Sequence, residues 1–196
     1  VHALREALVA AGGPAAAVQL VTGAVDVGRA LTTDRRIGVV SFTGSAAVGH
    51  QIAKDAAPTK VLLELGSNAA LIVAEDADLD AAASAVIRGG FYASGQACIS
   101  VQRVIVTAPV AEVFIDKVSA AMGDVVAGDP RDPDTQVSAL IDSRSTDRVR
   151  GWVEAAVDAG AREVLGAETA DRIARPTLLV DVPAGQSVWD EEIFGP

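Results

Sequence analysis

The chain has 196 residues, of which 50% are hydrophobic but only 4% are aromatic. Aliphatic side chains must therefore fill its core, which is typical of a soluble α/β protein rather than a disordered or fibrous one. The formal net charge is −10 and no basic run breaks it. This balance argues against a nucleic-acid partner and against a polybasic membrane patch.

Cysteine and histidine are scarce, which restricts redox and metal chemistry. Cys98 is the one cysteine, so no disulfide can form within the chain, and a cytoplasmic location is expected. The two histidines, His2 and His50, are far apart in sequence, and no metal site is expected. No stretch reaches the roughly 18 consecutive apolar residues of a membrane span. The first ten residues do not have the pattern of a signal peptide.

Short apolar runs that predict strands alternate with amphipathic runs that predict helices, the pattern of an α/β fold with a parallel sheet. The first part of the chain predicts the end of a helix at Leu4–Ala11, a strand at Val18–Val21, a short helix at Val27–Leu31, a strand at Ile37–Phe42, a helix at Ser45–Ala56 and a strand at Lys60–Leu65. A domain boundary is expected near Gly66, after the last of these strands.

The second part of the chain continues the alternation. It predicts strands at Leu71–Val73, Arg103–Thr107 and Thr177–Val180, helices at Asp78–Tyr92, from Pro109 onward and through 149–157 with an end at Gly160, and a loop at Gly128–Asp134. The helix after Pro109 has apolar positions at the helical period. Its predicted inner face consists of Val110, Val113, Phe114, Lys117, Val118 and Ala121.

Cys98 follows Gly95, Gln96 and Ala97, just before a predicted strand. A lone cysteine is most often a small buried hydrophobe. A nucleophile would instead need exposure in a turn and a lowered thiol pKa, and the glycine and glutamine favour a turn. A papain-like hydrolase would also need a histidine partner, which neither histidine provides in a recognisable context.

Two further features have both a structural and a functional interpretation. Glu64 is a charged residue in an apolar strand, either at a solvent-exposed strand end or buried with a raised pKa as a general base. The stretch Gly44–Gly49 joins a strand to a helix. Its free backbone N–H groups suit a phosphate, but an N-cap by Ser45 explains it equally well.

The order of four motifs is more specific than any of them alone. They are FTGS at Phe42–Ser45, LELG at Leu63–Gly66, GQAC at Gly95–Cys98 and EEIFGP at Glu191–Pro196. In this order and spacing the chain resembles the NAD(P)-dependent aldehyde dehydrogenase superfamily over essentially its whole length. The resemblance implies an α/β fold, with residues 1–65 as part of a Rossmann-like cofactor domain. Residues 66–196 would be part of the catalytic domain, with the cysteine in the crevice between them.

The resemblance also implies roles for individual residues. Cys98 would attack an aldehyde to give a thiohemiacetal, hydride would pass to NAD or NADP, and water activated by Glu64 would release a carboxylic acid from the thioester. The positions that match the family's cofactor-binding residues are Gly44, Ser45 and Gly49 along the pyrophosphate, Val48 towards the adenine, Leu65, Glu192 at the nicotinamide ribose and Phe194 beside it. The substrate would be a small-molecule aldehyde, and the parent enzyme would be a homodimer or homotetramer.

The chain departs from the family pattern in two ways. The LELG motif is more often followed by a second glycine, and here Ser67 stands at that position as a subgroup mark. Segments that the family has before and after these motifs are missing, including an oxyanion-hole asparagine and a ribose-binding lysine. We therefore expect a central fragment with little activity alone. The rival interpretations are a CoA-acylating relative, against which Glu64 argues, and a non-catalytic scaffold.

Overall fold

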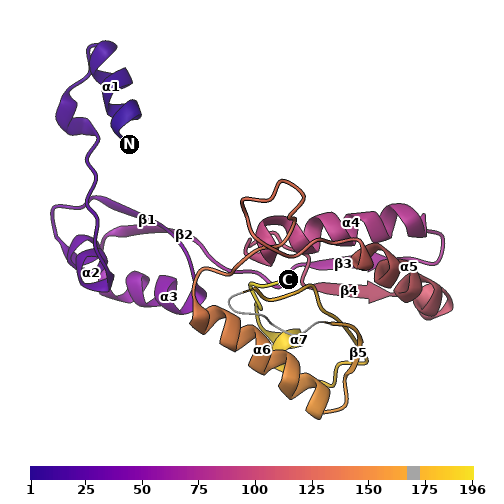
Figure 1. Cartoon of the computed structure of the whole chain (residues 1–196). Helices are drawn as coiled ribbons and strands as arrows, with labels where there is room; N and C mark the ends of the chain where they lie inside the picture. Colours follow the sequence, from indigo (N-terminus) through magenta and orange to yellow (C-terminus); the bar gives the residue numbers. More distant parts are fainter. Residues whose placement is uncertain (167–172) are drawn as a thin grey trace. The chain divides into compact units, whose positions relative to one another are not determined.

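The computed structural model describes residues 1–166 and 173–196 (Figure 1). The chain divides into two compact units, Val1–Leu65 and Gly66–Pro196. The division falls between Leu65 and Gly66, and the sequence predicts a domain boundary near Gly66. That these units are the cofactor and catalytic parts of an enzyme stays a prediction.

The first unit contains a parallel pair of strands with helices. Its elements are α1 (His2–Ala10), the 3₁₀ turn η1 (Ala15–Ala17), α2 (Val25–Thr33), β1 (Val39–Thr43), α3 (Ala46–Asp55) and β2 (Lys60–Glu64). Strand β1 pairs with β2 from Val39 opposite Lys60 to Thr43 opposite Glu64. Helix α3 begins where the sequence predicts, because the Ser45 hydroxyl caps it by accepting the Val48 N–H at 3.4 Å.

The predicted strand at Val18–Val21 is wrong. These residues form no strand, and β1 and β2 pair with each other in the described part of the chain. Leu20 and Val21 are more than half exposed, at 57% and 58%. An apolar run becomes a strand only when a neighbour accepts and donates its backbone hydrogen bonds, and no such neighbour is paired with it here.

The second unit holds most of the buried core. Its elements are β3 (Ala70–Val73), α4 (Leu79–Phe91), η2 (Tyr92–Gly95), β4 (Arg103–Val106), η3 (Ala108–Val110), α5 (Ala111–Gly123), α6 (Ser143–Asp158), β5 (Arg162–Leu165), β6 (Leu178–Val180) and α7 (Ser187–Asp190). Strands β3 and β4 are parallel, and α4 and α5 lie beside them (Figure 1). Val73, Val86, Phe114, Val118 and Met122 are buried in one cluster between these elements.

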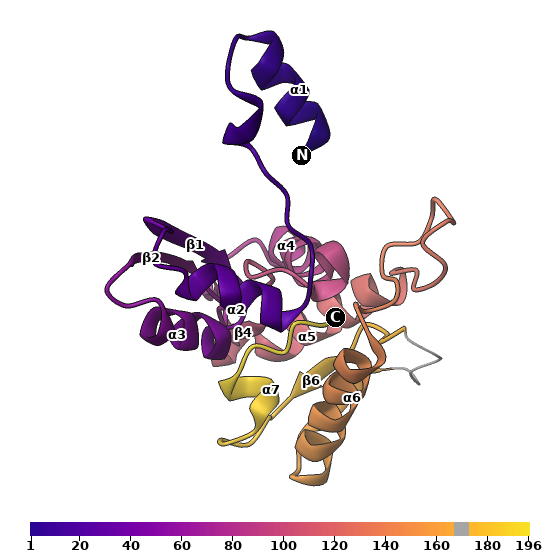
Figure 2. The ribbon, with the colours of Figure 1, turned by 90° about the vertical axis from the view of Figure 1, so that its left-hand side faces the viewer.

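Strand β5 is absent from the sequence-based prediction, and its pairing with β6 is antiparallel. Its residues, Arg162–Leu165, are two charged residues followed by two apolar ones, so they show neither the alternation nor the apolar run that indicates a strand. Helix α6 lies beside this pair in both views (Figures 1 and 2). Leu140, Val149 and Ala174 are buried next to Ile193 in a second, smaller cluster.

The inner face of α5 is partly mispredicted. Phe114, Val118 and Met122 are buried at a spacing of four residues, whereas Val113 is 54% exposed. Lys117 is only half-buried, and its ammonium lies 2.5 Å from the Asp80 carboxylate on α4. The apolar residues are numerous enough on this helix to fit two overlapping faces, and only the packing on α4 selects one of them.

Candidate active site

In the first unit, the strand-to-helix turn lies at the carboxyl edge of the β1–β2 pair. The Gly44 N–H donates to the Glu64 carbonyl oxygen at 3.0 Å, which places the turn next to the end of β2. Gly49 is buried, and a Cβ at that position would lie 2.3 Å from a Leu65 methyl carbon. Glycine thus lets α3 approach β2 closely.

This arrangement brings all the predicted site residues of the first unit together: Glu64, Gly44, Ser45, Val48, Gly49 and Leu65. The first turn of a helix carries backbone N–H groups without intrahelical partners, and its dipole favours an anion. The donor set therefore fits a phosphate. Packing of Gly49 on Leu65 and capping by Ser45 are structural roles that the same residues fill.

Glu64 lies at the end of β2 and is exposed. The alternative of a carboxylate buried inside the strand is wrong in this structure. The strand alternates in burial, with Val61 and Leu63 half-buried, and Glu64 follows on the opposite side from Leu63. Its exposure leaves Glu64 accessible to water.

In the second unit, Cys98 follows a turn of unusual backbone geometry and is exposed. Helix α4 ends at Phe91, and three successive residues then have positive φ: Ala93 at 49°, Ser94 at 59° and Gly95 at 73°. Two of these are not glycine, so the conformation must be held by its surroundings. Because Cys98 is exposed, the alternative of a buried hydrophobic cysteine is wrong.

Long-range hydrogen bonds hold this turn. The Ser94 hydroxyl accepts the Ser138 N–H at 2.9 Å, and the Gln96 side-chain oxygen accepts the Ile141 N–H at 2.9 Å. On the far side of Cys98, the buried Ser100 hydroxyl lies 3.2 Å from the carbonyl oxygens of both Gly89 and Gly90. Cys98 is thus an exposed thiol between two anchored points.

Ser67 connects the cysteine to the EEIFGP segment. Its hydroxyl donates to the carbonyl oxygen of Cys98, and its backbone N–H donates to the Glu192 carboxylate at 3.1 Å. Gly66 leaves room for that carboxylate, because a Cβ there would lie 2.0 Å from one of its oxygens. In the sequence, Ser67 stands out only as a departure from the family pattern, and no local signal reveals its two partners.

The end of the chain packs against the cysteine turn. A Cβ at Gly95 would lie 2.1 Å from the Gly195 carbonyl oxygen, so only glycine fits there. Phe194 has a φ of 49°, and Arg148 donates to the neighbouring Ile193 carbonyl oxygen at 2.7 Å. The structure thus gathers Cys98, Glu192 and Phe194, the predicted site residues of the second unit, around Gly66, Ser67 and Gly95.

Asn68, Arg103 and Trp189 form a group behind this site that the sequence did not indicate. The Asn68 amide donates to the Trp189 carbonyl oxygen at 2.7 Å, and Arg103 donates to the Asn68 carbonyl oxygen at 2.9 Å. The guanidinium carbon of Arg103 lies 5.5 Å from the centre of a Trp189 ring. These contacts fix the segment after Gly66 to the helix that precedes Glu192.

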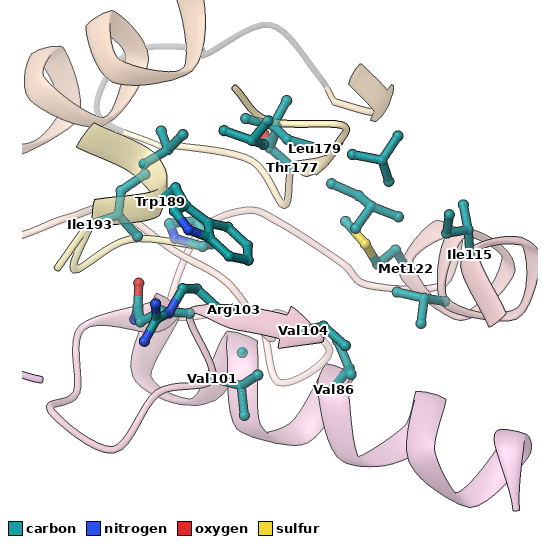
Figure 3. A pocket seen from close by; sticks show the side chains of 18 of the residues that line it. Val86, Val101, Arg103, Val104, Ile115, Met122, Thr177, Leu179, Trp189 and Ile193 are labelled. Carbon is teal, nitrogen blue, oxygen red and sulfur yellow. The ribbon is translucent and has the colours of Figure 1, made fainter. Parts of the chain in front are cut away.

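An apolar cavity of about 470 Å³ lies in the second unit. Figure 3 shows Val86, Val104 and Met122 on one side of it and Trp189 and Ile193 on another. Arg103 and Trp189 line it, but Cys98, Glu192 and Phe194 do not. The cavity is therefore separate from the exposed thiol.

Metal-ligand clusters and membrane-spanning helices are both absent from residues 1–166 and 173–196. Within these ranges no three His, Cys, Asp or Glu side chains come together as metal ligands. No helix in the same residues is both long and apolar enough to cross a membrane.

The sequence profile of the aldehyde dehydrogenase family matches residues 1–196, the whole chain. The chain belongs to this family. Its α/β elements are those of the family's solved structures, as the structural comparison shows. An aldehyde dehydrogenase match over every residue includes both the glycine turn of the first unit and the cysteine turn of the second.

Three relatives illustrate the similarity. A 3-sulfolactaldehyde dehydrogenase of Priestia aryabhattai is 37% identical over 194 residues, 98% of this chain and 41% of the relative. The structure of a glyceraldehyde-3-phosphate dehydrogenase from Methanocaldococcus jannaschii, complexed with NADP, is 34% identical with a TM-score of 0.94 and covers 98% of this chain and 42% of that one. The structure of an NAD-dependent aldehyde dehydrogenase from Sinorhizobium meliloti is 34% identical with a TM-score of 0.92, over 99% and 40%.

The chain therefore spans about two fifths of the length of the relatives it matches, 41% of the first of them. Family membership and fold rest on the aligned residues.

Proposed function

We propose that this chain contributes the nucleophile and the general base of an NAD- or NADP-dependent aldehyde dehydrogenase. The overall reaction would consume an aldehyde, water and the oxidised nicotinamide cofactor, and yield a carboxylic acid, the reduced cofactor and a proton. The observation that carries the proposal is the exposed Cys98 on an anchored turn, joined through Ser67 to Glu192.

In the first half of this reaction, Cys98 acts as the nucleophile. Its thiolate forms a bond to the aldehyde carbon, and the electron pair of the carbonyl moves to oxygen, which gives a thiohemiacetal. A bound nicotinamide supplies the acceptor for the hydride that then leaves this carbon. As the hydride departs with its electron pair, the carbonyl re-forms and Cys98 carries a thioester.

In the second half, Glu64 acts as the base. Its carboxylate takes a proton from water as the water oxygen bonds to the thioester carbon. The carbon–sulfur bond breaks, the acid leaves and Cys98 returns to the thiolate. An exposed carboxylate at a strand end suits this role because water must reach it.

Two groups of residues would hold the cofactor. The N-terminal turn of α3, with Gly44 and Ser45, offers the N–H donors and dipole that fit a pyrophosphate. The Glu192 carboxylate offers the acceptor that a ribose hydroxyl requires, and Phe194 adjoins it in sequence. Val48, Gly49 and Leu65 would shape the first of these sites, and the relatives in complex with or dependent on either nicotinamide support NAD or NADP.

The test is formation of reduced cofactor from a panel of short aldehydes, with the polypeptide of the complete open reading frame beside this 196-residue chain. Cys98→Ser should abolish turnover. Glu64→Gln should permit a first burst of reduced cofactor and then slow turnover about 100-fold or more, because general-base catalysis contributes about 10²–10⁴-fold. Glu75→Gln, at another exposed carboxylate, is the matched control.

Full activity of Cys98→Ser would overturn the proposal. Turnover that requires CoA, with an acyl-CoA product, would favour the CoA-acylating interpretation instead. Inactivity of the complete polypeptide with every aldehyde and both cofactors would favour the scaffold. We also propose that the parent enzyme is a cytoplasmic homodimer or homotetramer, and sedimentation of the complete polypeptide tests the number of subunits.

A further inference from the structure

We propose that Ser67 is a positioning residue that fixes the peptide of Cys98 and connects it to Glu192. The inference rests on the proposed function for the roles of those two residues. Ser67 itself touches no reacting atom, and it acts through the two groups to which it donates.

The two hydrogen bonds of Ser67 reach distant parts of the sequence. The hydroxyl donates to Cys98, 31 residues away, and the backbone N–H donates to Glu192, 125 residues away. Both bonds lie within the second unit. One short segment after β2 is therefore the common anchor of the nucleophile's peptide and of the carboxylate.

The hydroxyl supplies the middle of three anchors around Cys98. Gln96 fixes the residues before the thiol through Ile141, and Ser100 fixes those after it through Gly89 and Gly90. A peptide unit is planar, so a bond to the Cys98 carbonyl oxygen orients the whole unit that joins Cys98 to Ile99. The Ser100 N–H also donates to the Ala97 carbonyl oxygen at 2.9 Å, which closes a turn around this unit, and loss of the Ser67 hydroxyl leaves the unit inside that turn without its own bond to Ser67.

The backbone N–H forms the other connection, and Gly66 makes it possible. A Cβ at position 66 would lie 2.0 Å from one Glu192 oxygen, whereas the other oxygen accepts the Ser67 N–H. A side chain at position 66 would therefore push the carboxylate away. A change at position 67 would leave the N–H in place and remove only the hydroxyl.

This geometry allows the two connections to be cut separately. Ser67→Ala removes the bond to Cys98 and keeps the bond to Glu192, and Ser67→Thr keeps a hydroxyl as the conservative rescue. Gly66→Ala displaces Glu192 and keeps the Ser67 hydroxyl. Ser84→Ala, at an exposed serine on α4, is the matched control for loss of a hydroxyl.

The first measurement is steady-state kinetics of the polypeptide of the complete open reading frame. Ser67→Ala should lower kcat about threefold to fivefold at unchanged KM for the cofactor, since one net hydrogen bond changes a rate by about this factor. Ser67→Thr should restore kcat. Gly66→Ala should instead raise KM for the cofactor, because it disturbs the proposed ribose contact.

The second measurement is amide hydrogen exchange, which needs no activity. Ser67→Ala should speed exchange in peptides that cover Cys98–Ser100 about threefold to fivefold, with α5 and the unfolding midpoint unchanged. Parental exchange and parental kcat in Ser67→Ala would overturn the inference. So would an equal loss in Ser67→Ala and Ser67→Thr. An inactive parent with faster exchange in Ser67→Ala would overturn the proposed function and leave the positioning role standing.

Discussion

The two units hold their functional turns in different ways. In the first, the turn before α3 is fixed by a cap three residues along the chain and by one bond to the adjacent strand. In the second, the Cys98 turn is fixed by Ser67, Ser138 and Ile141, which lie 31 to 45 residues from their partners. The glycine turn therefore combines a local cap with one bond to the neighbouring strand, whereas the cysteine turn depends on three partners that all lie farther away in the sequence.

The second unit also buries more hydrophobic residues than the first. Val40 and Ala56 are the buried hydrophobic residues among the described residues of the first unit, and α1 and α2 bury none. The second unit has a continuous cluster around Phe114 and Val118. Because burial of apolar area is the main stabilising term in folding, we expect the second unit to unfold last.

The largest change in unfolding free energy is expected for a substitution in the core of the second unit. Phe114→Ala should cost about 3–5 kcal/mol of unfolding free energy, since Phe114 is only 2% exposed in the cluster. Val25→Ala, at a residue 86% exposed on α2, should change it by less than about 0.5 kcal/mol. Urea denaturation of both variants measures the difference. Equal losses would contradict the contrast between the two units.

Glycine-to-alanine changes should have opposite signs in the two units. Gly95→Ala should cost about 2 kcal/mol or more, because φ is +73° and the new Cβ would meet the Gly195 backbone. Gly28→Ala lies inside α2 with no heavy atom within 4 Å of its Cβ, and should stabilise by about 0.5–1 kcal/mol. Thermal unfolding of the pair gives both signs, and a destabilising Gly28→Ala would argue against the open position of that residue.

A smaller change in unfolding free energy tests the backbone conformation of the cysteine turn. Ala93→Gly should stabilise the chain by about 0.5–1 kcal/mol, because Ala93 has a φ of 49°. The free energy that its Cβ costs in that conformation is somewhat larger than this net gain. The gain is partial since glycine also increases the entropy of the unfolded chain. Urea denaturation measures it, with Ala120→Gly in helix α5, at a helical φ, as the control that should lose stability.

The smallest effect concerns pH and helix α6. Its N-cap, Asp142, accepts the Ser145 N–H and hydroxyl, each at 2.8 Å, and these bonds with the nearby Arg144 lower the pKa of Asp142 to about 2. A lowered carboxyl pKa contributes stability that is complete above the unfolded value of about 3.9 and is lost as the pH falls towards 2. In contrast to α6, α2 has Ala24 as its N-cap and therefore no side-chain cap.

Asp142→Asn tests this contribution, because asparagine caps a helix about as well and does not titrate. The melting-temperature difference between the parent and this variant should be a few degrees near neutral pH and shrink as the pH falls from about 5 to about 2. A difference that does not depend on pH over that range would exclude Asp142 as its source.

Features that depend on neighbours along the chain could be predicted from the residues alone. Helix α3 follows from Ser45, α4 from Asp78 at its N-cap, and strands β1 to β4 and β6 from their apolar runs. The order of four motifs also identified the family, because a family pattern is a property of the sequence. Cys98, Glu64 and the glycine turn are candidates for the same reason, since each lies within one of these motifs.

Which of these features meet depends instead on the tertiary structure. Among residues 1–166 and 173–196, the fold gives Val18–Val21 no partner strand, pairs β5 with β6, and turns Val113 of α5 towards solvent. It also exposes Cys98 and gives Ser67 its two partners. Burial and long-range hydrogen bonds depend on segments far apart in the chain, so no local pattern of residue types carries them.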